Sequence, residues 1–434
     1  MAGGGKKPKG GGSLLRAGNE GEARVTNLEL FFDLVYVFAI TQISHFLLAH
    51  HGIAALAEGL VIFAAIWWAW VYTTWAANWA DPERLPVRIM LLLAMLASLV
   101  MAVATPQAFG EHGMLFVSAY LAIQIGRSSF LAVVMSRSGH EVARTMQRIV
   151  MYFLASGCLW IAGALAHHPE TRLLWWAAAL LIEYSGPSTG YRIPFGAGVP
   201  PSDWRISGGH MAERCSLFVI IALGEGIVVT GATFAGQEFT LPNSSAFVAA
   251  FAGSALMWWI YFDVGAQRGA ELIEHHPEPG RIARSAYTYL HMPIVVGIIG
   301  SAVGDEMLLA HPGGQAEPAL VLAVCGGTGI YLLGVGLFKR FANPFRTFPM
   351  SHRFGLALLI ALAACGMFAH PPALAFGWAA VGILAAVSLW EWLSFHGGLV
   401  ERLGPRLGPL GRYLQRRAVQ AEANRARRFG SPGD

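Results

Sequence analysis

Long apolar stretches alternate with short polar gaps along almost the whole chain. A run of about 18 or more mostly apolar residues is long enough to cross a bilayer as an α-helix. The pattern therefore predicts an all-α polytopic membrane protein, a helical bundle with about 12 transmembrane helices. The predicted spans are 29–49, 54–77, 87–105, 113–135, 147–166, 172–187, 211–234, 244–267, 283–303, 317–338, 354–370 and 372–395.

The basic residues fall in every second gap between these stretches. Most of the 30 Lys and Arg residues lie in the N-terminal tail, in alternate gaps and in the C-terminal tail, and the intervening gaps contain only Arg172. Cytoplasmic segments of membrane proteins retain Lys and Arg. Both termini are therefore expected in the cytoplasm, and the direct partner of the chain is the lipid bilayer.

Composition supports a membrane protein and excludes several other classes. The chain is 55% hydrophobic and 13% charged, whereas a soluble domain carries about 25% charged residues. The net charge of +4 is explained by topology, so no nucleic-acid partner is expected. The four cysteines show no CxxC spacing, and P-loop, HExxH and GxSxG motifs are missing. The sequence therefore predicts neither a metal site nor a cofactor.

The two halves of the chain contain similar segments in the same order. LELFFDLVYVFAITQ, which contains Glu29, matches AERCSLFVIIALGEG, which contains Glu213. WWAWVYTTW matches MWWIYFDVG, and AAALLIEYS matches LAAVSLWEW, which places Glu183 opposite Glu391. Six spans are an even number, so both copies would face the same way. This predicts two parallel six-helix repeats, as in the halves of some transporters.

The repeat sets the expected domain organisation. The Gly-rich and basic N-terminal segment and the basic C-terminal segment read as cytoplasmic tails, the first of them disordered. A Pro/Gly-rich segment separates the two copies. The predicted boundaries are 1–26 for the first tail, 27–186 for the first repeat, 187–210 for the linker, 211–396 for the second repeat and 397–434 for the second tail.

A few ionisable residues lie inside the predicted spans, where a charge costs a few kcal/mol and usually has a partner in the bundle interior. Glu29 and Asp33 share one helix face because they are four residues apart. Further candidate partnerships join Arg127 or His291 to Glu225, and Asp263 to Arg214. Asp305–Glu306 is expected to be solvated beyond the ninth span. The candidate pathway residues are Glu29, Asp33, Arg127, Glu213, Arg214, Glu225, Asp263 and His291.

Several segments resemble one known family. ELFFDLVYVFAITQIS resembles the opening signature of the bacterial low temperature requirement protein A (LtrA) family, and WAANWADP, HMAERCSLFVIIALGEGIV, WWIYFD and YTYLHMPIVVGI are similar to later motifs of that family. The resemblance spans nearly the whole chain. It implies a multi-pass protein of the bacterial inner membrane linked genetically to growth in the cold. It implies no reaction and no substrate.

These observations favour a secondary transporter or channel-like protein rather than an enzyme. The two halves would enclose a polar pathway for a small solute or ion, with Asp33 and Glu225 as gating or proton-coupling carboxylates. One alternative is a membrane-embedded enzyme acting on a lipid or isoprenoid, which predicts acids and histidines in one cavity open to lipid. Another is a non-catalytic scaffold whose ion pairs only hold helices together. The sequence specifies neither the substrate nor the oligomeric state.

Overall fold

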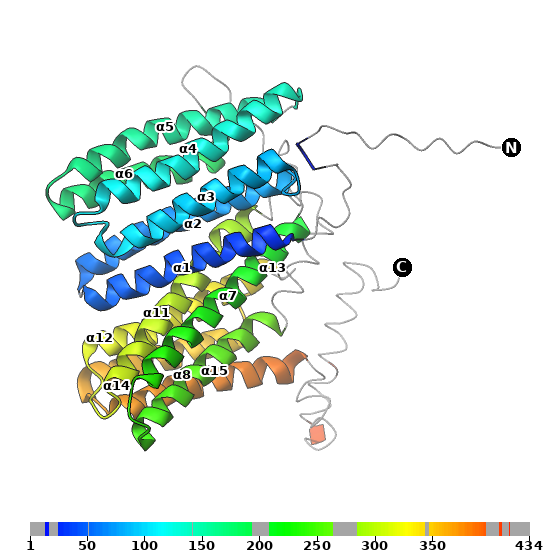
Figure 1. Cartoon of the computed structure of the whole chain (residues 1–434). Helices are drawn as coiled ribbons and strands as arrows, with labels where there is room; N and C mark the ends of the chain where they lie inside the picture. The colour runs from blue at the N-terminus through cyan, green and yellow to red at the C-terminus, as the bar shows by residue number, and fades with distance from the viewer. Residues whose placement is uncertain are drawn as a thin grey trace.

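The computed structural model describes residues 14–16, 25–50, 52–140, 142–192, 208–263, 284–342, 347–395, 408–409 and 416. These residues form a bundle of helices that run roughly parallel or antiparallel to one another (Figure 1). Isolated β-bridges at Leu15–Ala80 and Gln315–Pro372 complete the regular structure of this part of the chain. The predicted all-α fold is confirmed.

The long helices are α1 (Asn27–Ala49), α2 (Ile53–Trp79), α3 (Leu85–Ala104), α4 (Gly113–Arg137), α5 (Ala143–Leu165), α6 (Pro169–Thr189), α7 (Gly208–Ala235), α8 (Leu241–Phe262), α11 (His291–Ala310), α13 (Gly327–Ala342), α14 (Met350–Ala369) and α15 (Ala373–Phe395). The short elements are the 3₁₀ helix η1 (Thr105–Gln107), the π-helices η3 (Arg284–Tyr289) and η4 (Leu322–Gly326), and α12 (Pro318–Val321). Because α12, η4 and α13 follow one another directly, they form one continuous span.

Eleven helical segments of the described residues are long and apolar enough to cross a membrane. They match the predicted spans with the exception of the sixth, where α6 carries Glu170, Arg172 and Glu183 along its length. These charges lower the hydropathy of α6, although it packs against α5 and α2. Most of the predicted tails and of the 187–210 linker lies outside the described residues, and α6 and α7 extend into the two ends of that linker.

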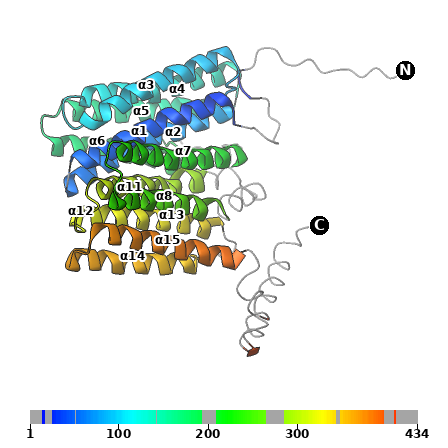
Figure 2. The same cartoon turned by 60° about the horizontal axis from the view of Figure 1, so that its bottom comes forward.

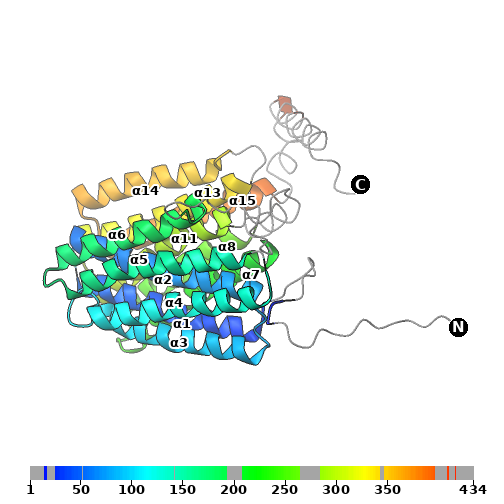
Figure 3. The ribbon, with the colours of Figure 1, turned by 90° about the horizontal axis from the view of Figure 1, so that it is seen from above.

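The helices form two groups in space. Helices α1–α6, the N-terminal group, lie above helices α7–α15, the C-terminal group, in the view of Figure 1. Figure 2 shows α7 directly beside α1, and Figure 3 places α3 and α14 at opposite edges of the bundle. α1 begins and α15 ends at the same end of the bundle. We call this end, whose loops carry Arg84 and Arg137, the basic end.

Each group has the same order of neighbouring helices. In the N-terminal group α1 contacts α2 and α3, α3 contacts α4, α4 contacts α5, α5 contacts α6, and α6 returns to α2. In the C-terminal group α7 contacts α8 and α11, α11 contacts α13, α13 contacts α14, α14 contacts α15, and α15 returns to α8. The neighbouring helices named here therefore follow one another in the same order in both groups.

Helix α2 is buried on most of its surface, because it is apolar all round. Its residues Trp67, Trp68, Trp70 and Trp75 are each at most 1% exposed. The Trp67 Nε1 group donates to the carbonyl oxygen of Thr288 in η3 at 2.8 Å. This hydrogen bond joins the two groups of helices, as do the contacts of α1 with α7 and α11. The boundary between the groups is therefore closely packed protein around α1 and α2.

Candidate functional site

Four ionisable side chains of α1 and α7 meet at the boundary between the two groups. Glu29 and Asp33 lie on α1, His210 and Arg214 lie on α7, and each is at most 1% exposed. Arg214 Nη2 lies 2.5 Å from Asp33 Oδ1, and Arg214 Nε lies 3.0 Å from Asp33 Oδ2. Arg214 Nη1 and His210 Nε2 lie 3.3 Å and 2.8 Å from Glu29 Oε1. We call these four residues the ionic cluster.

The spacing of the four residues explains how they meet. Glu29 and Asp33 are four residues apart, as are His210 and Arg214, so each pair lies on one face of its helix. Both α1 and α7 begin at the basic end and run in the same direction. Glu29 therefore faces His210, and Asp33 faces Arg214. Three members of the cluster are among the candidate residues predicted from the sequence. His210 is not, although its spacing from Arg214 repeats the Glu29–Asp33 spacing.

Asp33 has a third hydrogen-bond donor. Trp70 Nε1 of α2 lies 2.7 Å from Asp33 Oδ1, so the carboxylate accepts from both a guanidinium and an indole. The guanidinium carbon of Arg214 lies 5.7 Å from the centre of the Phe32 ring. The partnership expected between Arg214 and Asp263 is wrong, because the guanidinium contacts α1 instead.

Glu29 also closes the first turn of α1. The Thr26 backbone N–H donates to Glu29 Oε2 at 2.8 Å, and the Glu29 backbone N–H donates to Thr26 Oγ1 at 3.4 Å, which forms a capping box. Arg16 Nη2 lies 3.2 Å from both carboxylate oxygens of Glu29. Glu213, in contrast, is exposed on α7, where it accepts from the Val25 backbone N–H at 3.3 Å. Glu213 is therefore not part of the ionic cluster.

Arg127 of α4 turns toward α2 rather than toward Glu225. Its Nη1 lies 2.9 Å from Thr73 Oγ1 and 3.2 Å from the carbonyl oxygen of Ala69. Its Nη2 lies 2.5 Å from Gln124 Oε1. The expected contact between Arg127 and Glu225 is therefore wrong, since α4 packs against α2, α3 and α5.

The other expected donor to the α7 carboxylate also has partners elsewhere. His291 Nε2 lies 2.8 Å from the Tyr261 hydroxyl, and His291 Nδ1 lies 3.1 Å from the carbonyl oxygen of Ala286. Asp263 is the C-cap residue of α8, at the basic end. Neither His291 nor Asp263 joins the ionic cluster.

Glu225 stands apart from the other candidate residues. It lies on α7, is partly exposed, and has no hydrogen bond or ion pair with another described residue. The sequence predicts a polar pathway between the halves that contains both Glu225 and Asp33. Asp33 does not line an open pathway in this structure, because it is 0% exposed and accepts hydrogen bonds from three donor atoms.

A second buried network surrounds Glu183 of α6. Ser156 Oγ and Trp160 Nε1 donate to Glu183 Oε1 at 2.7 Å and 2.9 Å, and the Tyr120 hydroxyl donates to Glu183 Oε2. Gln124 Nε2 donates to the Tyr120 oxygen at 3.0 Å, and its Oε1 accepts from the α4 guanidinium. A continuous chain of hydrogen bonds thus links α6 to α4. In the sequence, Glu183 stands out only through the repeat, where it lies opposite Glu391.

In the part of the chain that the structure describes, eleven apolar helical segments enclose paired charges, which defines a multi-pass helical membrane protein. The family model described as "Bacterial low temperature requirement A protein (LtrA)" matches residues 24–388, and the chain belongs to this family. The uncharacterized protein RA0937 of Rhizobium meliloti (strain 1021) is 39% identical over 382 residues, which cover 88% of this chain and 92% of that relative. The resemblance inferred from the sequence motifs is therefore confirmed.

Proposed function

We propose that the protein is a secondary transporter or channel-like protein in which the ionic cluster is a gate between two six-helix halves. The observation that carries this proposal is the position of the cluster, which bridges α1 and α7 at the boundary of the two groups near the basic end. A buried ion pair is either formed or broken. It therefore favours separate closed and open conformations over a continuous range of conformations, as a gate requires. The transported species would be a small solute or ion.

We also propose that the two groups of helices are copies of one unit. Aligning the tandem tryptophans of α2 with those of α8 puts Ala69 opposite Ile260. Arg127 of α4 donates to the Ala69 carbonyl at 3.2 Å, and Lys339 of α13 donates to the Ile260 carbonyl at 2.8 Å. A cation on the fourth span of each group therefore reaches the same position on the second span.

The sixth span of each group extends this correspondence. Lys339 Nζ lies 2.5 Å from Glu391 Oε2 of α15, and His352 Nδ1 lies 3.2 Å from Glu391 Oε1. In the N-terminal group, hydrogen bonds link Glu183 to Arg127 through the side chains of Tyr120 and Gln124. Each group thus connects its second, fourth and sixth spans through a cation and a carboxylate, which supports a parallel repeat.

Within this proposal Glu225 is a carboxylate of the pathway. It lies on the same helix as Arg214, is partly exposed and is not neutralised by another described residue. The Asp33–Arg214 pair is closed in this conformation, so transport requires it to open.

One observation favours a second candidate function, a membrane scaffold. The Asp33 carboxylate is fully enclosed and accepts three hydrogen bonds, which is what a purely structural ion pair needs. The enzyme alternative has weaker support, because Glu29 and His210 meet where both are buried rather than in a cavity open to lipid.

Cysteine accessibility distinguishes a gate from a scaffold. The four native cysteines are replaced by alanine, Glu225→Cys is introduced, and inside-out vesicles expose the basic end to a membrane-impermeant thiol reagent. We expect Asp33→Asn to raise the labelling rate about tenfold or more, which corresponds to a shift of about 1.4 kcal/mol in the gate equilibrium. Glu170→Gln, on the exposed face of α6, is the control. Equal labelling in both backgrounds contradicts the gate and favours the scaffold.

A further inference from the structure

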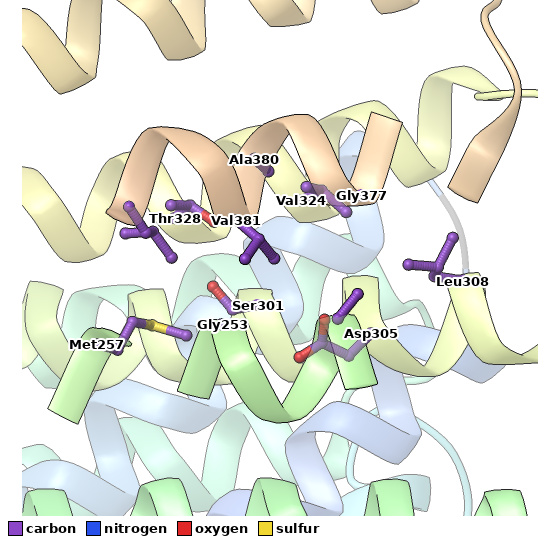
Figure 4. A pocket seen from close by; sticks show the side chains of 12 residues that line it. Gly253, Met257, Ser301, Asp305, Leu308, Val324, Thr328, Gly377, Ala380 and Val381 are labelled. Carbon is purple, nitrogen blue, oxygen red and sulfur yellow. The ribbon is translucent and has the colours of Figure 1, made fainter. Parts of the chain in front are cut away.

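A small, mainly apolar cavity with three polar side chains lies among the helices of the C-terminal group and shares no residue with the ionic cluster. Its polar lining consists of Ser301 and Asp305 of α11 and Thr328 of α13. Small or apolar residues of α8, α11, η4 and α15 form the remaining walls. Figure 4 shows Ser301 and Asp305 on neighbouring turns of α11, with Val381 of α15 across the open space. From the sequence Asp305 is expected to be solvated, but α11 continues to Ala310, and the partly exposed Asp305 lines the cavity.

Ser301 is the member of this cavity that most clearly lacks a partner. It is 6% exposed, and its hydroxyl oxygen has no hydrogen bond among the described residues. Other buried hydroxyls of the bundle, such as those of Ser98 and Thr73, donate to the carbonyl four residues earlier at 2.8 Å. A buried hydroxyl without a partner is unfavourable. Since Asp305 is four residues further on, its carboxylate lies on the same face of α11 as Ser301.

The walls around these oxygen atoms are held by close backbone contacts. A Cβ added at Gly300 of α11 would lie 2.8 Å from the Gly327 Cα, and one added at Gly304 would lie 2.8 Å from Val324 Cγ2. These contacts press α11 against η4, where the span changes from α-helical to π-helical. π-helical turns within membrane spans are frequent at functional sites. Thr328 is the second residue after η4 and lines the cavity.

The chemistry of the lining selects the ligand. Within the cavity, the volume that the centre of a water-sized sphere can occupy is about 30 Å³. One bound water needs about 10–15 Å³ by the same measure. One carboxylate and two hydroxyls are hard oxygen ligands that suit an alkali or alkaline-earth cation. A single positive charge balances Asp305, whereas a divalent ion would leave net charge buried in a medium of low dielectric constant. We propose that Asp305, Ser301 and Thr328 form a binding site for a monovalent cation, Na⁺.

Thermal unfolding of the full-length protein in lipid nanodiscs tests this site. NaCl is titrated at constant ionic strength, with choline chloride as the replacement salt. We expect a saturable rise of Tm with Na⁺, because a ligand that binds the folded state stabilises it. Asp305→Asn abolishes the rise, and Ser301→Ala moves its midpoint to about tenfold higher Na⁺ or more. Glu306→Gln, which changes the next carboxylate outside the cavity, retains the wild-type response.

The outcomes separate the cation site from its alternatives. If the Asp305→Asn variant does not fold, the Ser301→Ala variant still tests the site, because it preserves the charge of Asp305. If added choline chloride raises Tm as much as added NaCl does, the proposal is overturned. A rise of Tm with Na⁺ that is unchanged in the Ser301→Ala variant also overturns it. A response to pH without a response to Na⁺ also overturns it, because it assigns the cavity to a water and a titrating carboxyl group. This experiment measures cation binding. A negative result would therefore not contradict the gate, which the cysteine-accessibility experiment tests separately.

Discussion

Arg214 of α7 binds Asp33 of α1 through two nitrogen–oxygen contacts, 2.5 Å and 3.0 Å long, across the boundary between the two groups of helices. Both side chains are at most 1% exposed. Each charge is therefore neutralised by a residue more than a hundred positions away in the chain. The stability of the α1–α7 contact depends on both partners being present together.

Removing one partner of this pair should destabilise the protein strongly. We expect Asp33→Leu or Arg214→Leu alone to lower the free energy of unfolding by about 3–5 kcal/mol, because a buried charge is left without its partner. The double variant should lose less than the sum of the single variants. Denaturant unfolding in lipid-containing micelles, analysed as a double-mutant cycle, measures this coupling. Additive losses would mean that the two charges do not interact.

The indole of Trp70 should contribute through its hydrogen bond to Asp33. Trp70→Phe removes a donor to a charged group, which is expected to cost about 1.5–3 kcal/mol of unfolding free energy beyond the loss of ring volume. Trp68→Phe is the matched control, since the Trp68 Nε1 group has no acceptor among the described residues. A larger loss for Trp68→Phe than for Trp70→Phe would contradict the role assigned to the hydrogen bond.

The Glu183 network should require an acceptor-only side chain. Glu183→Gln replaces one acceptor oxygen by an N–H group that faces the donors of Ser156 and Trp160 or of Tyr120. Each donor left unsatisfied costs about 1–3 kcal/mol. The thermal unfolding temperature is expected to fall clearly for Glu183→Gln but not for Glu170→Gln, which lies on an exposed position of the same helix. Equal effects would indicate that the network is not fully formed.

The contact between α11 and α13 should tolerate no added methyl group. A Cβ at Gly300 would lie 2.8 Å from the backbone of Gly327, so Gly300→Ala must separate the helices and is expected to cost about 1–3 kcal/mol. At Gly231 of α7 nothing lies within 4 Å of an added Cβ, so Gly231→Ala should be neutral or stabilise the helix by about 0.5–1 kcal/mol. Unfolding measurements that rank the two variants the other way would rule out this packing.

The proposed orientation in the inner membrane can be tested with reporter fusions. We expect alkaline phosphatase fused after Gly110 to be active, because the 106–113 loop lies at the opposite end from the basic loops. The same reporter fused after Gly139 should be inactive in the cytoplasm. A cytoplasmic 106–113 loop would contradict the twelve-span count and the cytoplasmic position of both termini.

The helices were predictable from the sequence because apolar length determines a span independently of its neighbours. The partners of the buried charges were not, because they depend on which helices pack together. Arg214 was assigned to Asp263 on the adjacent span, but α7 packs against α1 and brings Arg214 to Asp33. His210 was missed because the predicted span began one residue after it, whereas α7 begins at Gly208.

Asp305 illustrates a different limit. The predicted ninth span ended at residue 303, whereas the regular helix runs from His291 to Ala310. Gly300 and Gly304 of this helix pack directly on Gly327 and Val324, a contact between distant segments that local hydropathy does not encode. A carboxylate that is expected to be solvated therefore lines a cavity between helices, where it stays partly exposed.

The matching four-residue spacing on α1 and α7 has a consequence for how the two helices can move. Acidic residues repeat at that interval on α1, and basic residues repeat at the same interval on α7. An axial displacement by one helical turn, about 5.4 Å, would bring Arg214 from Asp33 to Glu29, an oxygen of which it already approaches to 3.3 Å. Such a slide would leave the buried carboxylate of Asp33 without its guanidinium, which is costly, so the four charges together hold α1 and α7 in the axial register seen here.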